Sequence, residues 1–276
     1  MKEYQSKVCV AGKGLIACEF LSLLIMRYPQ LEVCAIPSKS DISQDSWMPS
    51  FLRKATELSV KTYSNWKDVS KNPNLIFISL EYDEIVDVKK FQTKKLYNLH
   101  FSLLPQYRGV YTSIFPILNG EKYVGVTLHQ IDNGIDTGPI VDQLKFKLPL
   151  NYTSRDLYFR YHFEGIKLLK RNLQNIVESG NLPLIIQEGK CSYYSRRDLN
   201  LSILEHDFNA TALEVHNFYR SLIFEEYQLP VAFKFKIRKS SITKNPSIDP
   251  PGNIVRETLN FLEVSTKDFN IRLHKN

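Results

Sequence analysis

The sequence predicts an α/β fold: a Rossmann-like, mostly parallel sheet with helices on both faces, followed by a smaller α+β appendage. The first observation behind it is the alternation of strand-like and helix-like patterns over the first 80 residues. The second is a change of texture beyond Pro183, to short strands and turns rich in Pro and Ser. We therefore expect a Rossmann-like domain over residues 1–182 and a smaller C-terminal α+β region over residues 183–276, ending in a β-hairpin.

Each element of this prediction follows from a local pattern. Apolar runs of strand length occupy residues 7–11, 32–36, 74–80 and 95–99, and helical patterns occupy residues 15–27 and 51–58. Residues 124–131 and 140–146 predict an antiparallel pair around a glycine-rich loop. Thr153 or Ser154 caps a long helix that continues to about Ser179. The appendage holds a helix near 210–222, an amphipathic basic strand at 231–239, and a terminal hairpin of 261–264 with 269–273.

Composition limits the class of protein. The 276 residues are 43% hydrophobic and 24% charged, which is typical of a soluble globular protein. No apolar run approaches the roughly 20 residues of a membrane span, and the first residues lack the apolar core of a secretory signal. The 4 cysteines form no C-x-x-C pair, so we expect free thiols in a reducing cytoplasm, with neither disulfides nor a bound metal.

The net charge favours an anionic partner. Lys and Arg number 36 against 29 Asp and Glu, which gives a formal charge of +7 and a pI near 9.0. Such a balance is compatible with a nucleic acid or with a phosphorylated small molecule.

A polar pair ends one of the buried strands. Asn98 and His100 lie two apart in the run that starts at residue 95, so they face the same side of the sheet. Polar side chains on such a face must be hydrogen-bonded or lie in a cleft. One interpretation is a satisfied core histidine beside a turn-forming asparagine; the other is a reactive site.

The loop at residues 132–138 favours the second interpretation. Its sequence, DNGIDTG, presents Asp136 on a tight turn, and its order does not fit a calcium loop. An amide that donates to an oxyanion, a histidine that acts as acid or base, and a carboxylate that orients the imidazole make a chemically coherent set. With no Ser or Cys nucleophile in the set, direct transfer to an incoming nucleophile is expected.

A glycine-rich turn raises a different hypothesis. Residues 12–17, GKGLIA, match G-x-G-x-x-A between a strand and a helix, which is typical of dinucleotide binding. The next strand ends in A-I-P-S, without the acidic residue that would hold a ribose. A dehydrogenase is therefore the weaker hypothesis, and a simple strand-to-helix turn the stronger one.

These motifs together resemble the folate-dependent formyltransferase family. The segments that carry the resemblance, within residues 74–145, are NLH at 98–100, SLLP at 102–105, YRG at 107–109, and GVT at 125–127 with D-x-G-x-DTG at 132–138. The resemblance implies an enzyme that transfers a formyl group from 10-formyltetrahydrofolate to an amine. Carried over by position, its catalytic residues would be Asn98, His100 and Asp136.

The formyl donor implied by the resemblance needs a pocket with apolar walls. The segment that leaves the third strand and the glycine-rich loop are the expected walls, at the edge where open α/β sheets bind ligands. The candidate cofactor-binding residues are Leu80, Tyr82, Ile85, Asp132, Gly134 and Ile135. A solvated acidic turn at residues 81–84 is the alternative.

The acceptor amine has three family alternatives: glycinamide ribonucleotide, initiator methionyl-tRNA, and nucleotide-linked amino sugars. The chain continues well beyond the long helix, unlike the glycinamide branch, and it lacks the insertion after the first strand typical of the tRNA branch. The motifs most resemble the nucleotide-sugar N-formyltransferases of dTDP-amino-dideoxyhexose type, with a role in lipopolysaccharide O-antigen biosynthesis. Attachment of the amine at C3 or C4, and thymine or guanine as the base, stay open. A folate- or nucleotide-binding module without catalysis is the non-enzymatic alternative.

A nucleotide-diphosphate sugar requires an aromatic face and cationic donors, and the appendage offers both. The candidate substrate-binding residues are Tyr227, Gln228, Arg220, Phe224, Arg196 and Arg197. Phe224 and Tyr227 have an alternative role as an apolar anchor of the appendage. We expect neither nucleic-acid nor membrane partners. The terminal hairpin leads us to expect a homodimer.

Overall fold

A computed structural model describes residues 7–179, 182–200 and 206–276. The described chain separates into two compact units. The first holds residues 7–108, 125–145, 161–179 and 182–192, and the second holds the rest. This division differs from the boundary expected at residue 182, because residues 109–124 and 146–160 belong to the second unit. Each unit is therefore made of several separate stretches of the sequence, and not of one continuous half.

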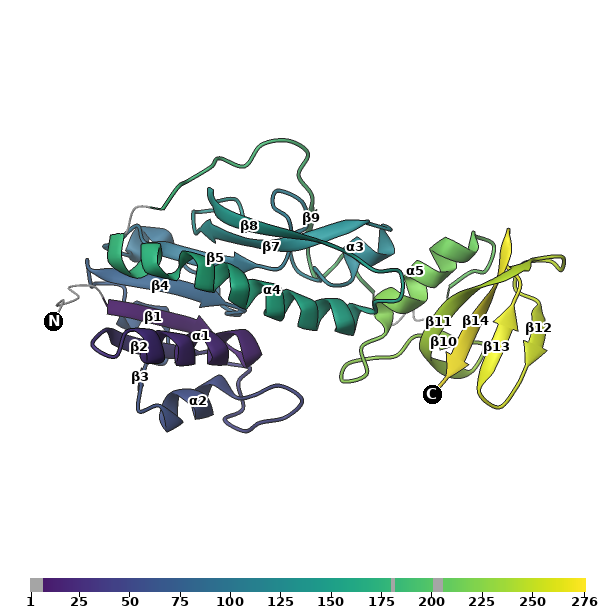
Figure 1. The fold of residues 1–276 in the computed structure, drawn as a ribbon, viewed down its shortest axis with the longest axis horizontal. Helices are drawn as coiled ribbons and strands as arrows, with labels where there is room; N and C mark the ends of the chain where they lie inside the picture. The colour runs from purple at the N-terminus through teal and green to yellow at the C-terminus, as the bar shows by residue number, and fades with distance from the viewer. Residues whose placement is uncertain (1–6, 180–181, 201–205) are drawn as a thin grey trace. The chain divides into compact units, whose positions relative to one another are not determined.

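The first unit is built on a mixed sheet with the strand order β3-β2-β1-β4-β5-β7-β8 (Figure 1). The strands from β3 to β5 run parallel, and β7 runs antiparallel to β5. Their bounds are β1 Lys7–Gly12, β2 Glu32–Pro37, β3 Lys61–Thr62, β4 Leu75–Leu80, β5 Leu96–His100, β7 Tyr123–Gln130 and β8 Ile140–Lys147. This confirms the predicted fold class.

Helices pack on this sheet where the sequence predicts them. They are α1 Gly14–Arg27, α2 Phe51–Glu57 and α4 Ser154–Gln174, which continues as a π-helical turn over Asn175–Ser179; short 3₁₀ turns lie at Trp66–Asp68 and Val88–Lys90. A Cβ on Gly165 of α4 would come within 2.8 Å of Leu99 and 3.4 Å of Ile16, so α4 lies close to both β5 and α1. All six residues of β4 are buried, as a parallel strand covered on both faces requires.

The turn after β1 needs glycine for a packing reason. A Cβ on Gly12 would stand 2.0 Å from the carbonyl oxygen of Leu80, because the ends of β1 and β4 lie side by side. The GKG sequence thus has a structural explanation in the close approach of two strands.

The second unit holds an antiparallel sheet with the order β10-β11-β14-β13-β12. Its elements are α3 Phe115–Leu118, α5 Ala212–Leu222, β10 Val231–Ala232, β11 Phe235–Pro246, β12 Ile254–Glu257, β13 Phe261–Val264 and β14 Phe269–Lys275; β6 Arg108–Gly109 and β9 Tyr193–Tyr194 form a separate two-stranded sheet. A capping box between Thr211 and Glu214 starts α5. The predicted terminal hairpin is confirmed, since β13 and β14 pair antiparallel.

One predicted strand of this unit is wrong. The basic segment 231–239 is not continuous, because Phe233 adopts a left-handed backbone (φ 53°) and the chain turns back between β10 and β11. Phe233 is consequently exposed, whereas Ile237 is fully buried in the core of the sheet.

Two further expectations concern the whole chain. Cys9, Cys18 and Cys34 are buried free thiols, and Cys191 is an exposed one. Within the described residues, no helix combines the length and the apolar character that crossing a bilayer requires.

Candidate active site

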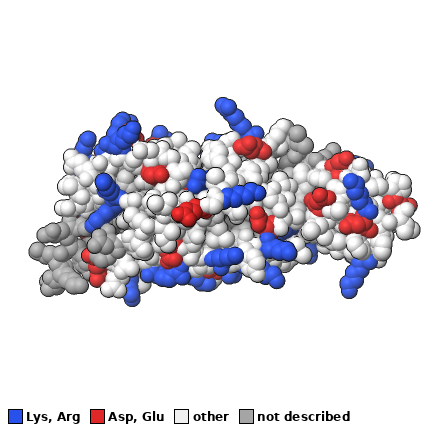
Figure 2. Space-filling model, turned by 90° about the horizontal axis from the view of Figure 1, so that it is seen from above, with Lys and Arg blue, Asp and Glu red and all other residues white. Residues whose placement is uncertain are grey.

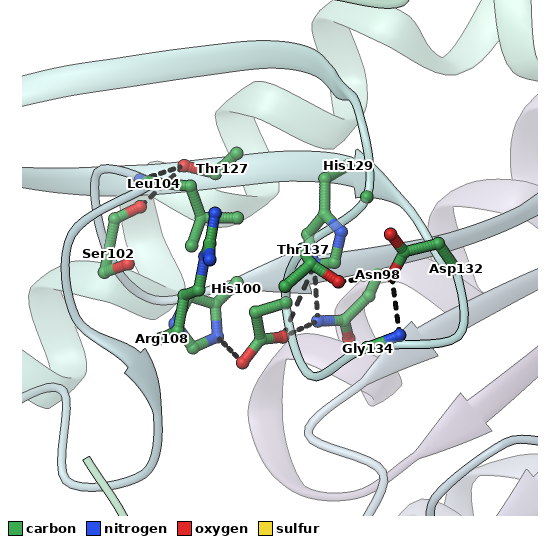
Figure 3. A network of polar contacts seen from close by, with 12 residues as sticks. Asn98, His100, Ser102, Leu104, Arg108, Thr127, His129, Asp132, Gly134 and Thr137 are labelled. Carbon is green, nitrogen blue, oxygen red and sulfur yellow. Dashed lines mark hydrogen bonds and ion pairs between the residues drawn. The ribbon is translucent and has the colours of Figure 1, made fainter. Parts of the chain in front are cut away.

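Asn98 and His100 project from β5 onto the same face of the sheet, as their spacing predicts (Figure 3). Asp136 lies in the loop between β7 and β8. The Asn98 Nδ2 atom donates to Asp136 Oδ1 at 3.3 Å. The Nδ1 atom of His100 lies 3.5 Å from Asp136 Oδ2. The structure therefore brings the three residues together around one carboxylate.

The loop that carries Asp136 is held rigid from within. Asp132 Oδ1 accepts hydrogen bonds from the backbone N–H of Gly134 (3.0 Å) and from the Thr137 hydroxyl (2.6 Å). A Cβ on Gly138 would stand 1.8 Å from the carbonyl oxygen of Gln130, so only glycine fits there. Asp136 itself adopts φ 55°, a conformation that a non-glycine residue rarely takes outside sites where the surrounding structure fixes it.

The imidazole of His100 is fixed by a backbone carbonyl. Its Nε2 atom lies 2.7 Å from the carbonyl oxygen of Tyr107, and because a carbonyl only accepts, Nε2 carries the proton. Tyr107 adopts φ 58°, so this carbonyl is presented by an uncommon backbone conformation. The other ring nitrogen, Nδ1, is thereby left to face Asp136. His100 is 7% exposed, so its imidazole lies in a largely water-excluded position.

Two residues of the polar cluster were not predicted. His129 of β7 is the register partner of Asn98, and its Nε2 atom lies 3.1 Å from Asn98 Nδ2 and 3.5 Å from Asp136 Oδ1. Its importance follows from the register between β5 and β7, which pairs it with Asn98. Gln187 donates from Nε2 to the carbonyl oxygens of Asp136 (2.9 Å) and Gly138 (2.7 Å), and no local pattern announces it.

Gln187 also connects the loop to an arginine. Its Oε1 atom accepts from Arg108 Nη2 at 2.7 Å and from Nε at 3.2 Å. The segment around Gln187 thus fixes the backbone on which Asp136 is mounted and orients a guanidinium of the YRG motif.

The candidate donor-binding residues have different environments. Leu80 is fully buried, so its side chain cannot meet a ligand, and the Asp132 carboxylate is engaged inside its own loop. Ile85 is 82% exposed and Ile135 is 43% exposed, which leaves two apolar side chains uncovered. Burial raises the pKa of the Tyr82 phenol. Tyr82 packs with Val86 and Ile131 against one core cluster, so both predicted walls adjoin the same part of the core.

The predicted substrate contacts of the second unit separate into two groups. Arg220 is 2% exposed and donates to the carbonyl oxygens of Pro149 (3.3 Å) and Tyr152 (3.0 Å) and to the Asn217 side chain (2.9 Å). Burial lowers the pKa of this guanidinium to about 10. Phe224 is also buried, at 5%. Neither side chain is placed to contact a nucleotide, because both are packed inside the unit.

The remaining candidates are exposed or half-buried. Tyr227 is 68% exposed and its ring lies 4.9 Å from that of Phe224, on a turn closed by hydrogen bonds between Phe224 and Gln228. Gln228 donates to the carbonyl oxygen of Leu222 at 3.1 Å. Arg196 and Arg197 are exposed. These four residues stay candidates for the acceptor site.

The positive charge is dispersed on the face of the molecule drawn in Figure 2. Lys and Arg side chains alternate there with Asp and Glu. Several cations among the described residues are paired with carboxylates, such as Arg171 with Asp142 at 2.8 Å and Arg155 with Glu226 at 2.7 Å. Dispersed and paired cations favour a small anionic ligand over an extended polyanion on this face.

The chain matches a protein family model and two solved structures of formyltransferases. Residues 83–173 match the family model described as formyl transferase. The chain is similar to WlaRD, a sugar 3N-formyl transferase crystallised with dTDP and 5-N-formyl-THF, with 40% identity and a TM-score of 0.91 over 99% of this chain and 98% of that one. It is also similar to an N-formyltransferase from Helicobacter canadensis in complex with folinic acid and dTDP-3-aminofucose, with 42% identity and a TM-score of 0.90 over 99% and 100% of the two chains.

A second class of relatives matches over a shorter length. The methionyl-tRNA formyltransferase of Clostridium beijerinckii is 30% identical over 191 residues, which is 67% of this chain and 59% of that protein. The chain therefore spans only 59% of the length of this tRNA-directed relative, whereas it spans nearly all of the two sugar-directed ones. The predicted resemblance is confirmed.

Proposed function

We propose, from the premise that this chain belongs to the formyltransferase family, that it transfers a formyl group from 10-formyltetrahydrofolate to the amine of a dTDP-linked 3-amino sugar. The observation that carries this proposal is the convergence of Asn98 and His100 on the Asp136 carboxylate, at 3.3 Å and 3.5 Å. The chain that holds this cluster is 40% identical to a sugar 3N-formyl transferase over 99% of its length.

The residues around the cluster fit a folate as formyl donor. When bound, 10-formyltetrahydrofolate supplies an activated formyl carbon whose bond to the folate nitrogen breaks during transfer. The exposed side chains of Ile85 and Ile135 are suited to an apolar ring system, and the rigid loop 132–138 offers backbone groups for its polar edge. Relatives crystallised with 5-N-formyl-THF or folinic acid support the assignment.

The three polar residues divide the chemistry. The neutral acceptor amine forms the new C–N bond at the formyl carbon, and Asn98 donates from Nδ2 to the oxygen on which negative charge develops. His100 has Nε2 engaged with Tyr107, so its Nδ1 atom and the Asp136 carboxylate are the groups that receive the amine proton. The same pair returns this proton to the folate nitrogen as it leaves, which balances the reaction.

The acceptor class is the finer part of the proposal. Two relatives of 40% and 42% identity are a sugar 3N-formyl transferase and an N-formyltransferase crystallised with dTDP-3-aminofucose, which favours thymine as the base and an amine at C3. We retain Tyr227, Gln228, Arg196 and Arg197 as nucleotide contacts and leave out Arg220 and Phe224, which are buried. Methionyl-tRNA is the second candidate, because relatives named for it are about 30% identical. A homodimer, a cytoplasmic location and a role in O-antigen biosynthesis stay predictions.

The proposal is tested by following the donor and the product separately. Titration calorimetry with 5-formyltetrahydrofolate should show saturable binding, and NAD should show none. Incubation with 10-formyltetrahydrofolate and a dTDP-3-amino sugar should then yield a product heavier by one formyl group in place of a hydrogen. Saturable NAD binding without folate binding would restore the dehydrogenase hypothesis and contradict the proposal.

A further inference from the structure

His129 is a buried histidine inside the polar cluster that the proposed chemistry does not use. It is 2% exposed, and its β7 backbone pairs in register with Asn98 of β5. Because paired residues of neighbouring strands point to the same face, the imidazole and the Asn98 amide meet (Figure 3). Each has a nitrogen within 3.5 Å of the Asp136 carboxylate. A charged or misdirected ring here would act directly on the groups that perform the transfer.

The hydrogen bonds of His129 define its tautomer. Its Nδ1 atom lies 2.9 Å from the carbonyl oxygen of Gln130, which can only accept, so Nδ1 carries the proton. In the neutral ring, Nε2 is then an acceptor. At 3.1 Å it faces the Nδ2 atom of Asn98, which can only donate. The ring therefore accepts one of the two amide hydrogens of Asn98.

The Asn98 amide contacts two acceptors, His129 Nε2 and Asp136 Oδ1, and only one of these contacts can persist during the reaction. One amide hydrogen points to His129 Nε2 (3.1 Å) and the other to Asp136 Oδ1 (3.3 Å). To donate to the formyl oxygen, Asn98 must release one of them. The contact with Asp136 is the longer one, and it involves the carboxylate that takes part in the proton transfer. The contact with His129 is the one that can persist throughout.

We propose that His129 is a positioning residue that anchors the Asn98 amide through its unprotonated Nε2 atom, so that the remaining N–H of Asn98 points at the formyl oxygen. This inference rests on the proposed function, because it assigns His129 to the oxyanion donor of that reaction. Without the ring nitrogen, the amide turns about its side-chain bond and presents its oxygen to the reacting carbonyl in part of the molecules.

Three variants separate this role from a structural one. His129→Phe keeps the ring volume and removes the acceptor. His129→Gln supplies an amide oxygen close to the position of Nε2. His216→Phe is the matched control, because His216 is 5% exposed and bonded through both nitrogens to Ser240 and to the carbonyl oxygen of Leu150, in the second unit.

Steady-state kinetics of these variants give the first readout. We expect His129→Phe to lower kcat by about 10- to 100-fold, a part of the 10²- to 10³-fold typical of losing an oxyanion donor, with both KM values unchanged. His129→Gln should recover most of the loss, and His216→Phe should lower the melting temperature without lowering kcat. An unchanged kcat in His129→Phe, or an equal loss in His129→Gln, would overturn the proposal.

A double-mutant cycle gives the second readout. If His129 acts through Asn98, the pair Asn98→Ala and His129→Phe should be no slower than Asn98→Ala alone. Multiplied losses would show that His129 acts independently, against the proposal. A ¹⁵N NMR spectrum of the wild-type protein at neutral pH should show His129 protonated at Nδ1. That spectrum tests the anchoring contact even if no acceptor is formylated, and an Nε2-protonated ring would contradict it.

Discussion

The polar cluster around Asn98 and the aromatic turn around Tyr227 were both predicted as parts of a site. In the structure, the side chains of the cluster contact one another, whereas those of the turn differ in exposure. In the cluster, neighbouring strands place the polar groups on one face, where they contact one another. In the turn, Phe224 is 5% exposed while Tyr227 is 68% exposed. Strand periodicity thus located side chains reliably, whereas spacing across a helix end and a turn did not separate core from surface.

The largest expected effect comes from breaking the cluster. Asn98→Ala, His100→Asn and Asp136→Asn should each lower turnover by about 10²-fold or more, because in the proposed mechanism each removes a group that donates to the oxyanion or receives the proton. Their combination should lose little beyond the worst single variant. Thermal melts provide the control, and wild-type turnover in all three variants would reduce the cluster to a structural polar network.

Arg220 should show an effect of comparable size on stability and none on substrate affinity. Arg220→Met leaves the carbonyl oxygens of Pro149 and Tyr152 without their charged donor. We expect the free energy of unfolding to fall by about 1.5 to 3 kcal/mol, the range for hydrogen bonds to charged groups. Denaturant unfolding measures this fall. A selective rise in the acceptor KM with unchanged stability would return Arg220 to the substrate site.

Tyr227 should behave in the opposite manner to Arg220. Its exposed ring is suited to stack on a nucleotide base, a contact worth about 1 to 3 kcal/mol. Tyr227→Ala should therefore raise the acceptor KM by about 10- to 100-fold while calorimetric folate binding is unchanged. Tyr123, another exposed tyrosine at 52%, supplies the control substitution. Equal KM values for Tyr227→Ala and Tyr123→Ala would remove the turn from the nucleotide site.

The smallest effect concerns pH and the buried His216. Burial lowers the pKa of His216, with a smaller contribution from Arg220 in the same direction. The unfolded chain, with an ordinary histidine pKa of about 6.5, then binds a proton before the folded chain does. Stability due to His216 is therefore complete above about pH 6.5 and falls as pH decreases toward its lowered pKa. Melting temperatures from pH 7.5 to 5 should fall less steeply in His216→Gln than in the wild type, and parallel slopes would contradict this.

The sequence located the parts of the site that depend on short spacings. Asn98 and His100 lie two apart in a strand, and the D-x-G-x-DTG loop can present its second carboxylate only on a tight turn, so their convergence was predictable. His129 was overlooked because its importance depends on cross-strand register, which pairs it with Asn98 only once β7 follows β5 in the sheet. Gln187 joins the site from a segment about 50 residues along the chain from the carbonyl oxygens it binds, and no local pattern encodes that contact.

The fold shows the same limit. Long periodic elements such as α1, β4 and α4 were predicted within a few residues of their bounds. The strands β6 and β9 have two residues each, which is too short to show a periodic pattern. Their pairing also joins segments that lie far apart in the sequence, so no local pattern predicts it. Residues 109–124 and 146–160 belong to the second unit because of tertiary packing. Local composition does not show this membership, so the sequence did not predict it.

The most direct test of the central claim is the kcat/KM for competing acceptors with 10-formyltetrahydrofolate as common donor. The panel contains a dTDP-3-amino sugar, a dTDP-4-amino sugar, glycinamide ribonucleotide and charged initiator tRNA. The account predicts the highest kcat/KM for the dTDP-3-amino sugar, and loss of that activity in His100→Asn. Preferred formylation of the initiator tRNA, by a protein whose His100→Asn variant is inactive, would keep the chemistry assigned to the cluster and contradict the assigned acceptor.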